Sequence, residues 1–99
     1  MSQAPVLVII EVQQIHDPAS FSAYQAAVRE QVIALGVRVI GRGGTSFEGH
    51  PEFCRLLVQQ WPSEQAFRDW QASADYAPLR ERRRRAASLR IAIVPQTIA

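Results

Sequence analysis

Near its N-terminus the chain reads VLVIIEVQQIHDP (residues 6–18), a strand pattern followed at once by a helix start. The apolar, β-branched run at 6–12 is interrupted only by Glu11 and predicts a largely buried strand. Asp17 can cap the free amides of a helix, and Pro18 is tolerated at its first position. Gly36 ends this helix, whose apolar face has residues at helical spacing: Phe21, Tyr24, Val28, Val32 and Leu35.

The rest of the chain completes the order β-α-β-β-α-β. We expect strands at 37–43, at about 53–61 and at 89–95. Ser63 can cap a helix that buries Ala66, Phe67 and Trp70, and a further helical piece covers about 76–87. This order predicts an α+β fold, namely a ferredoxin-like βαββαβ domain with a four-stranded antiparallel sheet. Since no repeat or linker interrupts the pattern, residues 1–99 form one domain.

The first predicted strand offers apolar side chains in both directions, with Val6 and Val8 on one side and Leu7 and Ile9 on the other. A ferredoxin-like sheet has helices on one face only, and a face open to water should carry polar residues. We therefore expect the uncovered face to meet a second copy of the chain, which predicts a homodimer.

The composition limits the classes of function. All the basic residues are arginine and the net charge is only +2, which does not by itself indicate a nucleic-acid partner. No apolar run approaches the ~20 residues of a membrane helix and the N-terminus lacks a signal-peptide pattern, so we expect a cytoplasmic protein and no membrane partner. Cys54 is the single cysteine, and neither metal-ligand spacing nor a cofactor fingerprint occurs; we expect no metal and no cofactor.

Several short motifs follow one another at a spacing that resembles a known family: Asp17-Pro18 before Tyr24, Arg42-Gly43-Gly44, Glu48-Gly49, Pro62-Ser63, Trp70, and Ser73 to Tyr76 with Arg80. From about Val8 to Val94 the chain is similar to domain-of-unknown-function family 1330, in the dimeric α+β barrel superfamily. The resemblance implies a ferredoxin-like subunit whose sheet pairs with a partner's sheet to close a barrel.

The same resemblance leaves the reaction open. Relatives in the superfamily include cofactor-independent monooxygenases, muconolactone isomerase-like enzymes and haem-handling proteins, whereas the family itself has no general reaction. The chain has Gln60-Trp61 where members often carry Glu-Phe, and Gly36-Val37 where they often carry Gly-Gly. The first difference removes a carboxylate that could have moved a proton.

Glu11 is a charged residue within an apolar strand, and a buried carboxylate needs a partner. Arg42, Arg55 and Arg80 are candidates for that partner. One hypothesis is a salt bridge that fixes the sheet or the dimer. The other is an arginine clamp for an anionic substrate, to which Glu11 would also contribute.

Aromatic and imidazole groups supply the remaining candidates. Tyr24, Phe67, Trp70 and Tyr76 should converge between helices and sheet, either as core or as a pocket for a small aromatic molecule oriented by the two tyrosine hydroxyls. His50 is a candidate acid-base residue in a loop, and His16 is a weaker one. If there is catalysis, we expect Arg42 to orient an organic anion, with His50 or Tyr24 moving a proton.

The run Arg82 to Arg85, with Arg80 just before it, could neutralise phosphates. It could equally favour the dipole at a helix C-terminus. Three functions remain open at this point. They are a homodimer that binds a small aromatic or anionic molecule and is a candidate cofactor-independent enzyme, a non-catalytic accessory dimer, and, as the weakest alternative, a nucleic-acid-binding protein.

Overall fold

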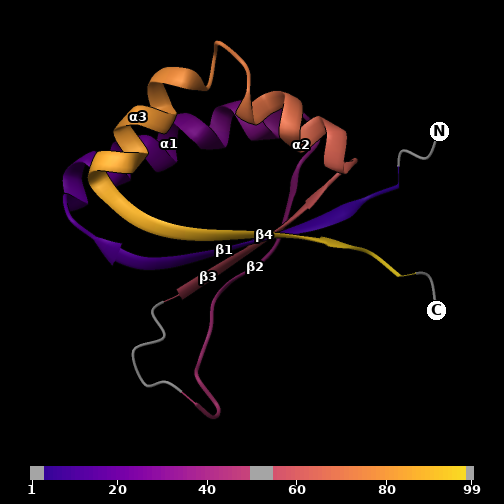
Figure 1. Ribbon diagram of the computed structural model, residues 1–99, viewed down its shortest axis with the longest axis horizontal. Coiled ribbons are helices and arrows are strands. Elements are labelled where there is room, and N and C mark those ends of the chain that lie inside the picture. Colours follow the sequence, from indigo (N-terminus) through magenta and orange to yellow (C-terminus); the bar gives the residue numbers. More distant parts are fainter. Residues whose placement is uncertain (1–3, 50–54, 98–99) are drawn as a thin grey trace.

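The computed structural model describes residues 4–49 and 55–97, and it confirms the predicted ferredoxin-like fold. Its elements in chain order are β1 (Val6–Ile15), α1 (Pro18–Ala34), β2 (Arg38–Gly43), β3 (Arg55–Trp61), α2 (Glu64–Gln71), α3 (Ala77–Ala86) and β4 (Ala87–Pro95). The strands form an antiparallel sheet in the order β2-β3-β1-β4. Figure 1 shows the three helices together on one side of this sheet.

Side chains at both predicted helix starts make the expected caps. The Asp17 carboxylate accepts a hydrogen bond from the Ser20 amide at 3.1 Å, and the Ser63 hydroxyl oxygen accepts one from the Ala66 amide at 3.0 Å. Gly36 follows α1 with φ of +80°, a conformation that costs other residues backbone strain. Local chemistry thus sets where the helices begin and where α1 ends.

Two strands are longer than predicted. β1 continues to Ile15 because its last residues pair with the start of β4, as Ile15 does with Ala87. β4 follows α3 without a loop, since the Ala86 carbonyl accepts hydrogen bonds from the amides of His16 and Asp17. The third strand begins at Arg55 in the structure; the two predicted residues before it, 53 and 54, lie outside the described part of the chain.

The sheet has two apolar faces. Val6, Val8 and Val12 point to the helices and are buried with Trp61 in the core. The strand register places the next set on the opposite, uncovered face: Leu7 and Ile9 of β1, Leu56 and Val58 of β3, and Ala92 and Val94 of β4. We call these six residues the open sheet face.

In the described part of the chain no helix is long and apolar enough to cross a membrane.

Candidate functional site

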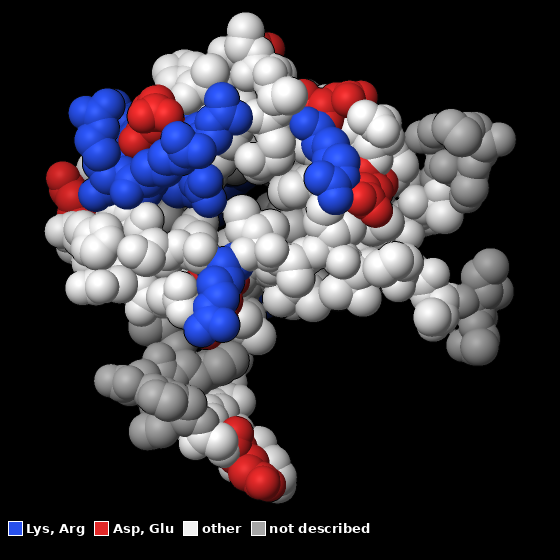
Figure 2. Space-filling view, viewed as in Figure 1, with Lys and Arg blue, Asp and Glu red and all other residues white. Residues whose placement is uncertain are grey.

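A groove of about 770 Å³ lies between the helices and the edge strand β4. Its lining residues come from three elements: Glu64, Phe67, Arg68, Gln71 and Ala72 in and after α2, Arg80 of α3, and Ile91, Ile93 and Pro95 of β4. Figure 2 views this side of the molecule, where arginine side chains gather beside a hollow between helices and sheet. The groove therefore combines an apolar wall with cationic groups, as small-molecule sites commonly do.

The apolar floor exists because the helices stop short of the sheet edge. Ile91 pairs with Ile10 and so points to the helix side of the sheet, yet it remains 38% exposed. Phe67 lines the groove and also packs edge-on against the core residue Trp61, with ring centroids 5.1 Å apart. The break between α2 and α3 leaves this part of β4 free to contact a ligand.

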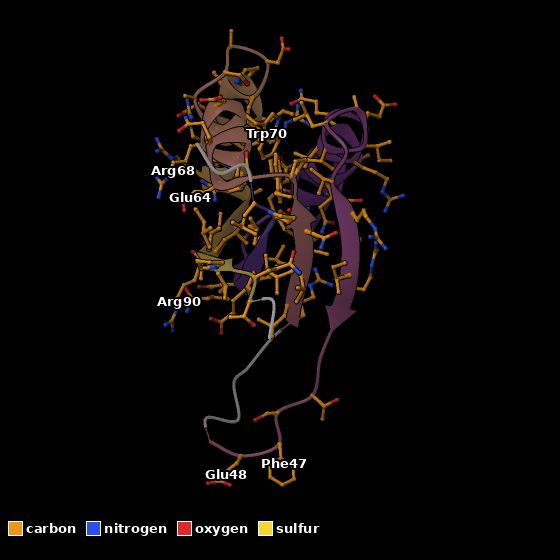
Figure 3. All side chains as sticks on the ribbon, turned by 90° about the vertical axis from the view of Figure 1, so that its right-hand side faces the viewer. Phe47, Glu48, Glu64, Arg68, Trp70 and Arg90 are labelled. Atoms are coloured by element: carbon orange, nitrogen blue, oxygen red, sulfur yellow. The ribbon has the colours of Figure 1, made fainter. Side chains whose placement is uncertain are left out.

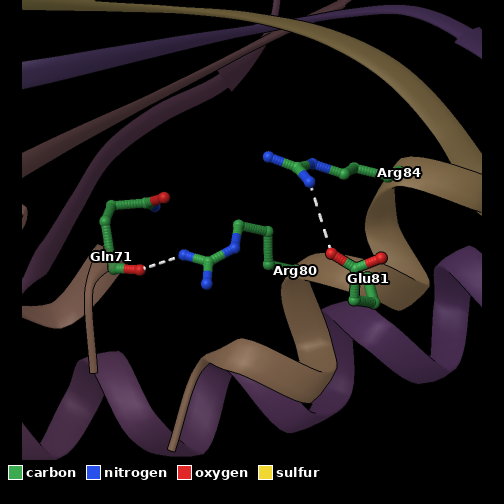
Figure 4. A network of polar contacts seen from close by, with 4 residues as sticks. All are labelled: Gln71, Arg80, Glu81 and Arg84. Carbon is green, nitrogen blue, oxygen red and sulfur yellow. Dashed lines mark hydrogen bonds and ion pairs between the residues drawn. The ribbon is translucent and has the colours of Figure 1, made fainter. Parts of the chain in front are cut away.

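Arg80 lies between the groove and the core. One of its guanidinium N–H groups donates to the Gln71 carbonyl at the end of α2, as Figure 4 shows. The guanidinium carbon also lies 5.9 Å from the centre of the Tyr76 ring, a cation–π contact. A guanidinium has five N–H donors, so a partly buried Arg80 can bind a carboxylate while it keeps both contacts.

Arg68 marks the outer end of the groove. Its guanidinium forms an ion pair with Glu64 one helical turn away, at 2.7 Å between Nη2 and Oε2. Both side chains are largely exposed, so this pair contributes little to stability. Two guanidinium groups and one carboxylate leave the groove with a net positive charge, which favours an anion.

The predicted aromatic residues do converge, behind Arg80. Tyr24 and Tyr76 are buried and their hydroxyl oxygens are 2.8 Å apart. Trp70 packs on Tyr76 with centroids 4.2 Å apart and donates its indole N–H to the Gln31 side-chain oxygen at 2.8 Å. Burial, followed by the neighbouring Tyr76, raises the pKa of Tyr24 above its ordinary range. Tyr24 is therefore protonated at neutral pH, and its hydroxyl shares a hydrogen bond with that of Tyr76.

Glu11 and Arg42 lie elsewhere and apart from each other. Glu11 pairs with Arg90 at 3.6 Å across β1 and β4, so the expectation that Arg42, Arg55 or Arg80 is its partner is wrong. Arg90 sits opposite Glu11 in the strand register, whereas β3 separates the strand of Arg42 from β1. Arg42 is exposed on β2, at the far edge of the sheet from the groove.

The remaining candidates do not meet the groove. The His16 Nε2 atom lies 3.0 Å from the Ser88 hydroxyl, at the other end of β4. His50 and Cys54 lie outside the described residues. Within Arg82 to Arg85, Arg84 pairs with Glu81 at 3.3 Å, and the run continues α3 to its C-terminus. The described part of the chain has no group of three or more residues placed to hold a metal ion.

Sequence reasoning missed most of the groove lining. Glu64, Arg68 and Gln71 occupy one helix at spacings of three and four, which is a signal for a shared face. The β4 residues alternate as Ile91, Ile93 and Pro95 and so read as ordinary core. Only the position of the α2–α3 break in space shows that they are uncovered.

Comparison with known proteins places the chain in a group of similar folds. The family model described as "Domain of unknown function (DUF1330)" matches residues 5–97. No protein with a curated function is significantly similar in sequence. A protein of unknown function from Rhodopseudomonas palustris, RPA0582, is 17% identical with a TM-score of 0.78, over 99% of this chain and 86% of that one.

Two further solved structures are similar over nearly their full length. SnoaB from Streptomyces nogalater, described as a cofactor-independent oxygenase, is 14% identical with a TM-score of 0.67, over 96% of this chain and 97% of that one. A protein of unknown function from Bacteroides fragilis is described as dimeric with a ferredoxin-like fold. It is 10% identical with a TM-score of 0.64, over 97% of this chain and 100% of that one. At such identities these likenesses establish the fold alone.

Proposed function

Because the chain belongs to the DUF1330 family, whose description names no reaction, we propose a function from the groove itself: it binds a small organic anion with an aromatic or apolar body. The observation that carries the proposal is Arg80, a partly buried cation beside an apolar floor. The guanidinium would bind the anionic group, and the floor formed by Phe67, Ile91 and Ile93 would bind the body.

We extend the proposal to a cofactor-independent enzyme. The support is the similarity in fold to SnoaB, together with a cation placed to stabilise negative charge on a bound phenolate, enolate or carboxylate. Trp70 and Tyr76 would act through Arg80, since Tyr76 lies under its guanidinium and Trp70 packs on Tyr76. The catalytic assignments to Tyr24 and His50 stay predictions, as does the cytoplasmic location.

We also propose that the protein acts as a homodimer. The open sheet face carries six apolar residues from three strands, and a solved protein of similar fold is described as dimeric. A second copy packed there would remove this apolar area from water.

A fluorescence titration with 8-anilinonaphthalene-1-sulfonate, an aromatic anion, tests the ligand proposal. Arg80→Gln removes the central cation, and Arg82→Gln makes the same change of charge on α3 at a residue that does not line the groove. Loss of a charged hydrogen bond predicts affinity about tenfold lower for Arg80→Gln, with little change for Arg82→Gln.

Circular dichroism of both variants controls for the α2 contact that Arg80 also makes. Equal weakening in the two variants would reduce the effect to general charge and contradict the proposal. Steep salt dependence with an oligonucleotide would instead favour the run Arg82 to Arg85 as a nucleic-acid site. Binding of neither probe would contradict the ligand proposal and favour the alternative of a non-catalytic accessory dimer.

A further inference from the structure

The loop after β2 carries a fully exposed aromatic side chain. Phe47 is 98% exposed and stands beside Glu48, which is exposed as well. Figure 3 shows both side chains at the tip of a loop that projects away from the sheet and helices. We call residues 44–49 the arm. At this position the whole Phe47 ring is available to contact another molecule.

The chemistry of the tip matches that of the groove. The tip presents one aromatic ring and one carboxylate, while the groove presents an apolar floor and the guanidinium groups of Arg68 and Arg80. The tip has a charge of −1, and the two arginines with Glu64 give the groove a charge of +1, so the two surfaces complement each other in charge and polarity.

The arm lies far from the groove of its own copy. It follows β2 at one edge of the sheet, whereas the groove borders β4 at the opposite edge, beyond β3 and β1. In Figure 3 Phe47 and Glu48 lie at the opposite end of the molecule from Glu64 and Arg68. A groove that receives the arm therefore belongs to another molecule.

Both edges of the sheet carry exposed apolar residues that a second copy would cover. Val39 and Ile40 of β2 are 47% and 51% exposed, and Ile91 and Val94 of β4 are 38% and 39% exposed. Exposed apolar edge strands are usually paired or covered in folded proteins. A second copy whose β2 side approaches this β4 edge would bring its arm toward the groove.

We infer that the tip of the arm docks in the groove of a second copy of the chain. Phe47 extends the apolar wall of that groove, Glu48 pairs with Arg68 at its outer end, and Arg80 remains available for a ligand. The inference uses the groove of the proposed function but does not need its ligand. Each site is then complete only when a partner supplies Phe47.

Cross-linking between two differently tagged copies tests the contact without a ligand. In a Cys54→Ser background one copy carries Ser46→Cys, which keeps Phe47 and Glu48, and the other carries Ala72→Cys, which lines the groove one helical turn after Arg68. The matched control is Gln25→Cys, exposed on α1. We expect the mixed disulfide with Ala72→Cys to form about tenfold faster than with Gln25→Cys, because docking raises the local concentration.

A pair of loop variants supplies the second readout. Phe47→Ala should weaken binding of 8-anilinonaphthalene-1-sulfonate about fivefold, since truncating an interface aromatic commonly costs that much, whereas Thr45→Ala should not. Probe binding with no preferred cross-link would uphold the ligand proposal and overturn this one. A preferred cross-link in a protein that binds no probe would uphold the docking and overturn only the ligand proposal.

Discussion

The buried contact between Tyr24 and Tyr76 allows a quantitative test of how this core is held. The hydroxyl oxygens are 2.8 Å apart, and the two side chains are only 8% and 1% exposed. Tyr24→Phe removes one partner and leaves the Tyr76 hydroxyl buried without it, which should cost about 1–3 kcal/mol of unfolding free energy. In a domain of this size each 1 kcal/mol lowers Tm by about 4–8 °C.

The double variant Tyr24→Phe/Tyr76→Phe removes both hydroxyls and should cost less than the sum of the single changes. The expected coupling is about 0.5–1.5 kcal/mol, because no hydroxyl is then left unpaired. Urea unfolding followed by the fluorescence of the buried Trp61 and Trp70 measures all four proteins. The protein concentration must be fixed, since association would contribute to stability. Strictly additive costs would refute the reasoning that these hydroxyls satisfy each other.

The same tyrosine, the open sheet face and one glycine each supply a further prediction. Burial raises the pKa of Tyr24 above its ordinary 10.0, so above about pH 10 the folded state keeps a proton that the unfolded state releases. The free energy of unfolding should therefore be unaffected by this group below about pH 10 and should fall above it. Urea unfolding at a series of alkaline pH values should show a smaller fall for Tyr24→Phe. Val58→Asp places a charge in the open sheet face and should raise the dimer dissociation constant at least about 100-fold in analytical ultracentrifugation. Ile33→Asp, at an exposed position of α1, is the control and should not raise it. Gly36→Ala should lower the free energy of unfolding in urea by about 1 kcal/mol, because the φ angle of Gly36 is +80°. Gly41→Ala is the control and should change it little, because the φ angle of Gly41 is not in the left-handed region and its surroundings leave space for a methyl group.

Much of the fold could be predicted because its signals are local. Asp17 and Ser63 cap helices where expected, and the nearly continuous apolar run of β1 predicts a strand with two apolar faces. The strand ends are less predictable, because Gln13 and Gln14 interrupt the apolar pattern of β1. The end of this strand is held by its pairing with Ala87 and Ser88 in β4. That pairing is between segments more than seventy residues apart, and no local pattern specifies it.

The candidate site was only partly predictable for a related reason. Trp70, Tyr76 and Arg80 were found because aromatic and cationic residues stand out in the sequence, and they do lie together. Arg68 was missed because it pairs with Glu64 as any surface arginine might, and Ile91 because it reads as core. The groove exists because the helices leave part of β4 uncovered, and this can be seen only when the helices and the sheet are placed in space.

The most direct test of the ligand-binding proposal is an ¹H–¹⁵N NMR titration with 1-hydroxy-2-naphthoate, a small aromatic carboxylate. We expect saturable shifts concentrated in the amides of the residues that line the groove, namely Glu64, Phe67, Arg68, Gln71, Ala72, Arg80, Ile91 and Ile93. These shifts should be lost in Arg80→Gln and kept in Arg82→Gln. Shifts confined to the open sheet face or to residues 82–85, or no saturable shift at all, would contradict the proposal.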